Sequence, residues 1–304
     1  MQEFMHSIPG YDSWLRITPL QKGWSRDEKY IVETKQNEKN LLRISPAEET
    51  EAKQKDYTAL LSIQHLNIQM SRPLAFGLLD DGRPYTLLTW LEGSDAESKL
   101  PLLSENEQYQ LGWLAGEALI KLHSIPAPAT QSPWQERFRR KTQRKLEIYS
   151  NCPIKIPGGE ALVGYLTNNF QLLQNRPQCF QHGDYHCGNL IITSDNQIGI
   201  IDFNRLDYGD PFEEFNRIAW CAAVSPHFAS GRIDGYFQGK VPDEFFPLLA
   251  FYIGSNQLSS ISWAMPFGQE QIQVMQKQGE DVLKWYKNFS TVIPTWYSAG
   301  VRTQ

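Results

Sequence analysis

Alternating apolar and polar positions dominate the first third of the chain and predict a small β-rich unit. The runs that alternate in this way are 14–18, 29–34, 40–45 and 84–91. Polar segments join them, including a turn around Gly23 and a hairpin connection over 35–39. The charged stretch 47–64 is predicted to be a helix, because a helical turn places four of its residues on one apolar face: Ala52, Ala59, Leu60 and Ile63.

The period of the pattern changes after Glu92 and Gly93, where helical spacing replaces alternation. A helix that ends before Pro126 is predicted from apolar residues at every third or fourth position: Leu111, Leu114, Ala115, Ala118, Leu119 and Leu122. From Phe212 to about Ser290 the chain is again predicted to be mostly helical. We therefore expect an α+β architecture of two lobes, with a small β-rich lobe over 1–92 and a larger, mainly helical lobe over 93–304.

Composition limits the classes of function. The 304 residues are 41% hydrophobic and 21% charged, which is ordinary for a globular protein. A formal net charge of −5 argues against a general nucleic-acid binder. The surplus of carboxylates is compatible with a cationic ligand, although such a surplus is commonly just solvated surface. The oligomeric state is left open.

The start of the chain and its cysteines bear on location. Residues 1–15 lack a basic segment followed by an apolar one, so no secretory signal is expected. No apolar run approaches the roughly 20 residues of a membrane helix. The cysteines form no close C-x-x-C pair and are expected to be reduced thiols: Cys152, Cys179, Cys187 and Cys221. We expect a cytoplasmic protein with no membrane partner.

The most specific chemical pattern lies between Gln181 and Asp202. His182, Asp184 and Asn189 follow the spacing H-x-D-x-x-x-x-N, and Asp202 is followed by phenylalanine. Phosphoryl transfer needs a carboxylate that orients the attacking hydroxyl, and hard oxygen ligands that hold Mg²⁺ against nucleotide phosphates. Asp184 suits the first task, and Asn189 and Asp202 suit the second.

The local pattern also explains how these side chains could meet. Two short β-rich runs, 190–193 and 198–202, flank a turn over 194–197 and predict an antiparallel hairpin. Asn189 precedes the first strand and Asp202 ends the second, so both lie at the open end of the hairpin. Asp184 is expected on a loop at the same end.

These residues resemble the aminoglycoside phosphotransferase family, a branch of the protein-kinase-like superfamily that also includes metabolite kinases. The H-G-D form around Gly183 and the G-D-P element at 209–211 are typical of these small-molecule enzymes. The resemblance implies a protein-kinase-like bilobal fold. It also implies ATP or GTP as co-substrate, Mg²⁺ as cofactor, Asp184 as catalytic residue, and Asn189 and Asp202 as metal ligands.

The resemblance implies a phosphate-binding cation on the third strand, where the family has lysine and this chain has Arg43. Arginine can grip a phosphate with two hydrogen bonds, so the electrostatic role could survive. The helix carboxylate expected to pair with it is Asp56 or Glu51, and we favour Asp56.

The same resemblance implies the other nucleotide contacts. Gly23 and Ser25 belong to the loop expected to cradle the phosphates through backbone N–H groups. The backbone of Thr89, Trp90 and Leu91 is expected to bind the purine.

Three further groups of residues have competing interpretations. His182, His186 and Cys187 lack a second ligand pair, which argues against a zinc site. The carboxylates Asp210, Glu213 and Glu214 could bind a cationic aminoglycoside, or could simply be a solvated helix start. A basic run is predicted to be a solvated helix face, with a phosphate- or membrane-facing patch as the minority reading: Arg137, Arg139, Arg140, Lys141, Arg144 and Lys145.

The sequence thus predicts an O-phosphotransferase acting on a small hydroxylated molecule, aminoglycoside-like by resemblance. A kinase for choline, an amino alcohol or a sugar is the alternative within the enzyme class. A nucleotide-binding pseudokinase is the alternative outside it, motivated by Arg43. Antibiotic resistance does not follow from the family alone, since substrate choice resides in the site and not in the fold.

Overall fold

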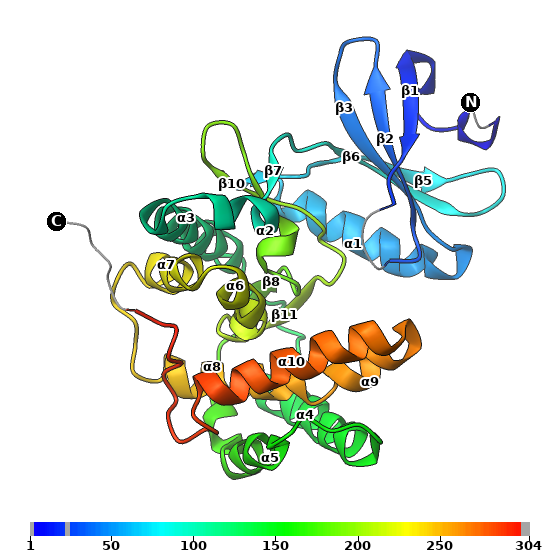
Figure 1. Cartoon of the computed structure of the whole chain (residues 1–304). Helices are drawn as coiled ribbons and strands as arrows, with labels where there is room; N and C mark the ends of the chain where they lie inside the picture. The colour runs from blue at the N-terminus through cyan, green and yellow to red at the C-terminus, as the bar shows by residue number, and fades with distance from the viewer. Residues whose placement is uncertain (1–2, 22–24, 299–304) are drawn as a thin grey trace.

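The computed structural model describes residues 3–21 and 25–298 and divides into a small and a large lobe (Figure 1). The small lobe is a five-stranded antiparallel sheet in the order β1-β2-β3-β6-β5. Its strands are β1 (Trp14–Pro19), β2 (Glu28–Thr34), β3 (Lys39–Ile44), β5 (Pro73–Leu78) and β6 (Pro84–Thr89). Four of them match the predicted alternating runs. The pattern did not predict β5, which begins at a proline and has a register shift after it.

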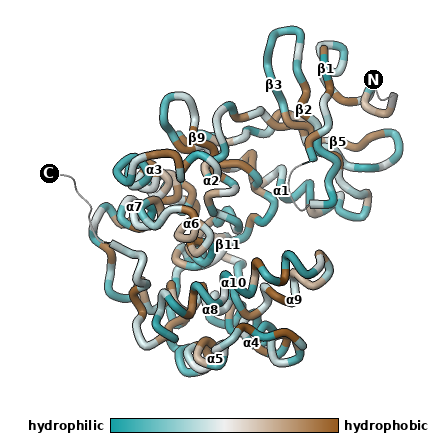
Figure 2. Tube along the Cα trace, viewed as in Figure 1, coloured by the Kyte–Doolittle hydropathy of each residue, from teal (hydrophilic) through white to brown (hydrophobic). Residues whose placement is uncertain are grey.

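Helix α1 (Thr50–Ile63) crosses the side of this sheet that faces the large lobe, and a 3₁₀ turn (Ala47–Glu49) precedes it (Figure 1). Leu60 and Ile63 are buried as predicted, whereas Ala52 is exposed. A separate apolar cluster, which includes Met5, Tyr11 and Leu42, forms the core of the small lobe. The connection between β2 and β3 is hydrophilic (Figure 2).

A second sheet links the lobes. It has the order β4-β10-β9-β7, built from β4 (Gln69–Met70), β7 (Ser94–Asp95), β9 (Leu190–Ile192) and β10 (Ile198–Ile200). β9 and β10 are the predicted antiparallel hairpin. β4 comes from the first ninety residues yet pairs in parallel with β10. A third pair, β8 (Cys179–Gln181) with β11 (Asp207–Gly209), brackets the catalytic pattern in sequence.

The large lobe is helical. Its longer helices are α3 (Glu105–His123), α4 (Trp134–Asn151), α5 (Gly159–Asn168), α7 (Pro226–Tyr236), α8 (Phe245–Gln257) and α10 (Gln269–Trp285). Shorter helices are α2 (Ala96–Lys99), α6 (Ile218–Val224) and α9 (Ser260–Ala264), with a 3₁₀ segment, η7 (Glu213–Arg217), before α6. α3 begins with a capping box between Ser104 and Glu107. All six of its predicted core residues are buried or pack against the core.

Helices α3 and α7 pack with almost no side chain between them. A Cβ at Gly112 would lie 2.2 Å from the Phe228 carbonyl oxygen, and one at Gly116 would lie 2.4 Å from that of Arg232. Glycine is therefore required at the contact, because any larger residue would push the two backbones apart. This contact fixes the position of α7, whose Arg232 reaches the catalytic loop.

Within the part of the chain that the structure describes, no helix combines the length and apolar character needed to cross a membrane. The four cysteines are buried free thiols.

Candidate active site

The catalytic loop begins directly after β8 and turns at a glycine. His182 is fully buried, and its Nε2 lies 2.9 Å from the carbonyl oxygen of Ile201. Gly183 has φ of 79°, and a Cβ there would lie 1.9 Å from the carbonyl oxygen of Arg205. Its N–H donates to both carboxylate oxygens of Glu214, at 3.0 and 3.2 Å. The H-G-D form thus has a local steric cause, since a side chain at 183 would collide with the backbone.

The loop is held from beneath by two buried charged residues. Burial alone would raise the pKa of Glu214, but the nearby His123, with its Nε2 3.9 Å from Oε2, and the Gly183 N–H help to outweigh burial, and the pKa is lowered. Arg232 donates through Nη1 to the carbonyl oxygen of Tyr185 at 2.8 Å and through Nη2 to that of Glu214 at 3.1 Å. The loop backbone is therefore positioned by ionic hydrogen bonds from η7 and α7.

Asp184, the predicted catalytic residue, has two arginines beside it. Its Oδ1 lies 2.6 Å from Arg217 Nε, and its Oδ2 lies 3.6 Å from Arg205 Nε. His186 Nε2 is 3.6 Å from Oδ1, and burial lowers the pKa of His186 to about 4, which keeps the ring neutral. The sequence pattern predicts neither arginine, because each lies outside the motif and reaches Asp184 only through the fold.

Asn189 and Asp202 lie at the open end of the β9–β10 hairpin, as predicted. The Ile201 N–H donates to the Asn189 carbonyl oxygen at 3.1 Å, which makes the two flanks neighbours. The Asn189 amide donates to the carbonyl oxygen of Asp184 at 2.9 Å. Asp202 adopts a left-handed backbone with φ of 65°, a conformation that costs energy outside glycine and is common at functional sites. Asn204, where the D-F-G pattern has glycine, hydrogen-bonds the Asp202 carboxylate.

The donor set at this hairpin fits Mg²⁺ bound together with a nucleotide. Asn189 and Asp202 supply an amide oxygen and a carboxylate, both hard oxygen ligands. Among the described residues, no group of three or more histidine, cysteine or acidic side chains could hold a metal by itself. Mg²⁺ is commonly held by one or two carboxylates, with substrate phosphates and water completing its shell.

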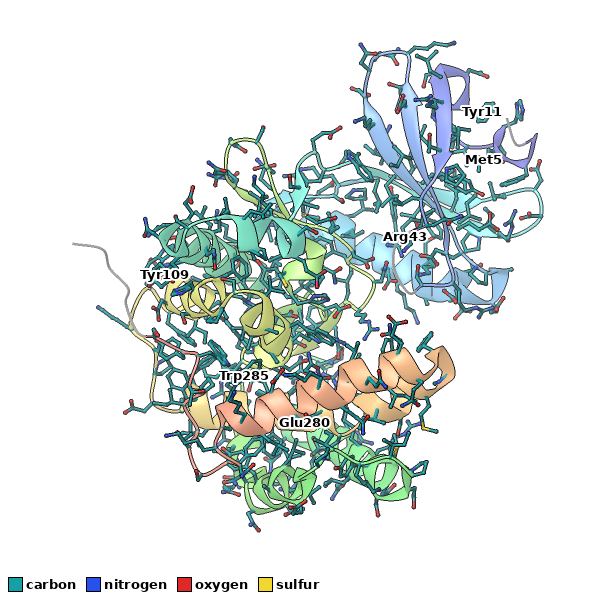
Figure 3. The ribbon with its side chains drawn as sticks, in the orientation of Figure 1. Met5, Tyr11, Arg43, Tyr109, Glu280 and Trp285 are labelled. Atoms are coloured by element: carbon teal, nitrogen blue, oxygen red, sulfur yellow. The ribbon has the colours of Figure 1, made fainter. Side chains whose placement is uncertain are left out.

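The expected partner of Arg43 was wrong. Arg43 is buried between the sheet and α1 (Figure 3), and its Nη2 lies 2.5 Å from Asp27 Oδ2. Its Nη1 lies 2.7 Å from Asp202 Oδ1. Neither Asp56 nor Glu51 forms an ion pair with Arg43 in the described chain; Glu51 is exposed. The helix contributes a cation instead, since Lys53 Nζ lies 3.3 Å from Asp27 Oδ1.

Asp27 is the functional carboxylate that sequence reasoning missed. Its side chain is only 1% exposed and also accepts a hydrogen bond of 2.9 Å from Ser45 Oγ. Burial alone would raise its pKa, but Arg43 and Lys53 outweigh burial and lower it. Strand register contains a signal: Lys29 pairs with Arg43, so Asp27, two residues earlier, lies on the same face and diagonal to Arg43. Asp202 has its pKa lowered in the same way, with Arg43 as the main cause opposing burial.

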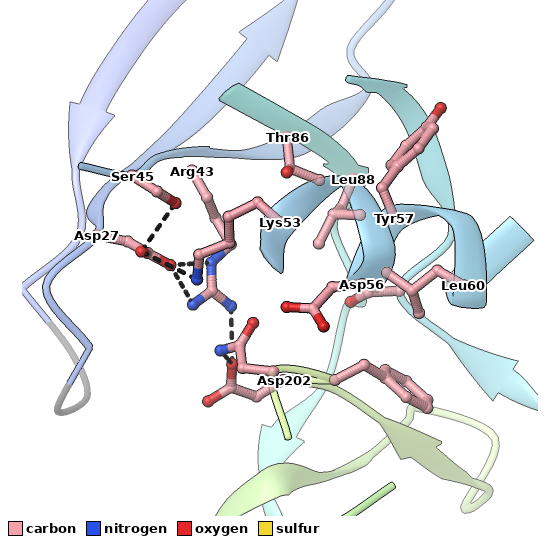
Figure 4. A pocket seen from close by; sticks show the side chains of 13 residues that line it. Asp27, Arg43, Ser45, Lys53, Asp56, Tyr57, Leu60, Thr86, Leu88 and Asp202 are labelled. Carbon is pink, nitrogen blue, oxygen red and sulfur yellow. Dashed lines mark hydrogen bonds and ion pairs between the residues drawn. The ribbon is translucent and has the colours of Figure 1, made fainter. Parts of the chain in front are cut away.

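Asp56 lies in the same pocket without touching Arg43 (Figure 4). It lines a cavity of about 30 Å³, between α1, β3, β6 and the segment after β10, together with Tyr57, Leu60 and Phe203. Burial raises the pKa of Asp56. A cavity of this size holds one or two waters, which could solvate that carboxylate.

The nucleotide contacts predicted from the small lobe are described in part. Gly23 lies outside the described residues. Ser25 is exposed and lines an open hollow beside β2 with Asp27 and Lys29.

The predicted purine-binding segment begins at Thr89, the last residue of β6. The N–H of Thr89 donates to the Arg72 carbonyl oxygen at 2.9 Å, and that of Trp90 donates to the Lys39 carbonyl oxygen at 3.1 Å. These two donors are already used inside the sheet. A base would therefore have to use the carbonyl groups of the segment or the N–H of Leu91.

The three carboxylates considered for substrate binding are turned inward. Asp210 is fully buried, with its Oδ2 2.6 Å from Arg176 Nε. Glu214 braces the catalytic loop, as described above. Glu213 is 7% exposed and lies 3.3 Å from Lys141 Nζ. The fold therefore uses these carboxylates for internal ion pairs and hydrogen bonds.

Solved structures similar to this chain include aminoglycoside phosphotransferases. An apo thermostable mutant of aminoglycoside phosphotransferase APH(4)-Ia is 14% identical, with a TM-score of 0.69, covering 90% of this chain and 96% of that one. A ternary complex of the same phosphotransferase with ADP and hygromycin B is 14% identical, with a TM-score of 0.69. That match covers 93% of this chain and 98% of the other. The GDP complex of aminoglycoside 2′-phosphotransferase-IIIa is 16% identical, with a TM-score of 0.68, and the match covers 92% of this chain and 95% of the other.

These identities are low, so the likeness establishes the protein-kinase-like fold alone. No curated protein sequence matches the chain. The sequence profile of the phosphotransferase enzyme family, however, matches residues 16–246, which include both lobes of the site. The chain therefore belongs to the phosphotransferase enzyme family, whose reaction is phosphoryl transfer to an alcohol group of a small molecule.

Proposed function

We propose that this protein transfers the γ-phosphoryl group of ATP or GTP to a hydroxyl of a small molecule in the cytoplasm. Asp184 orients the acceptor hydroxyl and takes its proton. Asn189 and Asp202 hold Mg²⁺, which when bound neutralises charge on the nucleotide phosphates. Positioning and charge neutralisation make up most of this catalysis.

The nucleotide would lie between the lobes. Arg43 binds its phosphates, in the role that a strand lysine has elsewhere in the superfamily, and Asp27 keeps the guanidinium in place. The loop containing Gly23 and Ser25 covers the phosphates, while the segment from Thr89 to Leu91 receives the purine. Asp56 is assigned to the small cavity at the back of this pocket, beside the nucleotide site.

One observation carries the proposal: the amide of Asn189 donates to the backbone of Asp184 at the open end of the hairpin that ends in Asp202. The predicted proton acceptor and both predicted metal ligands therefore form one connected unit. Structural neighbours include complexes with ADP, GDP and AMP-PNP, which supports a nucleotide co-substrate. A pseudokinase would not need this unit intact.

For the acceptor, a metabolite kinase is favoured over an aminoglycoside kinase. Neighbouring structures hold gentamicin, streptomycin or hygromycin B. In this chain Asp210, Glu213 and Glu214 have internal partners and are buried, so they are poorly available to a cationic drug.

A radiolabelled-phosphate screen with ATP and GTP tested separately would examine the proposal. The acceptors are aminoglycosides, macrolides, choline, sugars and their acids. Transfer to at least one acceptor is expected from the wild type, and Asp184→Ala should abolish it. Asp195→Asn is a matched control, because Asp195 is an exposed carboxylate at the other end of the same hairpin. Nucleotide binding without transfer to any acceptor would support the pseudokinase alternative instead.

A further inference from the structure

Positive charge surrounds the predicted catalytic carboxylate. Arg217, from η7, and Arg205, from the loop after Asp202, both lie against Asp184. A single carboxylate neutralises only one of two guanidinium groups. Burial and the nearby Arg205 lower the pKa of Arg217, against the attraction of Asp184, Glu213 and Glu214. An uncompensated positive charge is therefore present where the acceptor hydroxyl must bind.

Helix α4 adds to this charge through one face of its basic run. Arg137, Lys141 and Lys145 recur every fourth residue and share that face. Arg137 pairs with Asp207 at 2.8 Å and Lys141 with Glu213 at 3.3 Å. These two carboxylates neutralise Arg137 and Lys141, so the charge that remains on this face is that of Lys145.

Lys145 differs from Arg137 and Lys141, the other two cations on this face. It has no ion pair among residues 3–21 and 25–298. Burial lowers its pKa to about 7, Lys141 and Arg217 reinforce this by repulsion, and Glu213 opposes it. Lys145 is half-buried and lies one turn from Lys141, on the face of α4 that contacts η7 through Glu213. A cation in this position is suited to receive a ligand anion.

The charges of the whole cluster do not balance. Four cations, Arg205, Arg217, Lys141 and Lys145, lie near three carboxylates, Asp184, Glu213 and Glu214. Of these carboxylates, Glu214 already accepts from the Gly183 N–H. A polycationic aminoglycoside would be repelled here, whereas an anion would be attracted and held by charge-assisted hydrogen bonds.

We propose that the acceptor is a small hydroxylated molecule that carries a carboxylate or phosphate group, and that Arg217 and Lys145 bind this anion while the hydroxyl meets Asp184. The inference rests on the proposed phosphotransferase function and specifies its substrate class. The anion would displace Arg217 from Asp184 and so leave the carboxylate free to accept the proton.

A charge-matched acceptor panel tests this proposal. Glucose, glucosamine, gluconate and glucose 6-phosphate share a skeleton but differ in charge, and kanamycin provides a polycation. We expect kcat/KM for the anionic members to exceed that for the others by about tenfold or more, and the two anionic arms distinguish carboxylate from phosphate. A preference for glucosamine or kanamycin would overturn the proposal.

Variants separate the acceptor site from the nucleotide site. Arg217→Gln and Lys145→Gln should each raise the KM for an anionic acceptor about tenfold, the loss of one charge-assisted hydrogen bond, with the KM for ATP unchanged. Arg144→Gln removes the same charge from the exposed face of α4 and should change neither. An increase confined to the KM for ATP would overturn the proposal, because it would assign these cations to the nucleotide.

Binding provides a readout that does not depend on turnover. Millimolar gluconate, glucose 6-phosphate or inorganic phosphate should raise the thermal unfolding midpoint of the wild type, and Arg217→Gln should lose that increase. No increase with any of these anions would overturn the proposal even if phosphotransfer to a neutral or cationic acceptor is found. Conversely, anion binding without any transfer would count against the proposed function and leave the anion site standing.

Discussion

The two ends of the candidate site treat charge in opposite ways. At the proposed nucleotide end, Arg43 and Lys53 are matched by the buried Asp27 and the half-buried Asp202. At the acceptor end, cations outnumber carboxylates around Asp184. A matched network is positioned before any ligand arrives, whereas a surplus is satisfied only when a ligand brings the opposite charge. We therefore assign the balanced end to the nucleotide, which the family shares, and use the unbalanced end to infer the class of acceptor.

The largest expected effect is on the residues that join the two ends. Asp184→Asn should lower kcat by about 10² to 10⁴-fold, because it removes the proton acceptor. Asp202→Asn should lower it comparably by weakening the metal site. Steady-state rates with an identified acceptor measure both, with Asp195→Asn as the control. A normal rate in Asp184→Asn would contradict the role given to this carboxylate.

The matched network should be costly to break. Arg43→Met leaves Asp27 buried with only Lys53 for charge balance, and should destabilise the protein by roughly 3–5 kcal/mol. Arg43→Lys keeps the charge but loses the second ionic hydrogen bond, so its loss should be smaller. Urea unfolding measures both variants. Equal stability of Arg43→Met and the wild type would show that the nucleotide end is not the matched network described.

The glycine contact between α3 and α7 supports the acceptor end through Arg232. Gly116→Ala would place a methyl group 2.4 Å from the Arg232 carbonyl oxygen, and should cost about 1–3 kcal/mol of stability. Gly164→Ala is the matched control, because Gly164 is also helical but has nothing within 4 Å of its Cβ position. It should be neutral or stabilising by up to about 1 kcal/mol. Thermal unfolding that ranks the two variants in the reverse order would contradict the close-packing argument.

The smallest expected effect is on how folding stability depends on pH, which should differ between the two ends of the site. The pKa of Lys145 is lowered from 10.5 to about 7, so between those values the unfolded chain binds a proton that the folded chain lacks. Stability should therefore rise with pH across this window, and Lys145→Met should remove that rise, on the order of 1 kcal/mol after solvent screening.

The nucleotide end should respond at acid pH instead. The pKa of Asp27 is lowered below 3.8, so its contribution is present above that value and lost as pH falls through the folded pKa. Asp27→Asn should remove this acid-sensitive part. Urea titrations at a series of pH values test both ends, and a Lys145→Met curve parallel to that of the wild type would contradict the lowered pKa.

The sequence by itself determined the parts of this protein whose cause is local. Strand alternation, the apolar stripe of α3 and the hairpin around 194–197 each depend on neighbouring residues, and the H-x-D-x-x-x-x-N pattern lies within one loop and one hairpin. Family membership follows from the match of the family's sequence profile to residues 16–246, a range that includes this pattern.

Only the tertiary structure decided which charges meet. Arg43 and Asp202 are far apart in the chain, Asp27 belongs to no motif, and Arg217 reaches Asp184 from a different 3₁₀ segment. The roles of Asp210, Glu213 and Glu214, and of the basic run in α4, could not be predicted from sequence for the same reason. Burial determines whether a charged residue faces solvent, another side chain or a ligand. Coulomb energies depend on distance and local dielectric, and neither can be read from sequence spacing once the partners come from different elements.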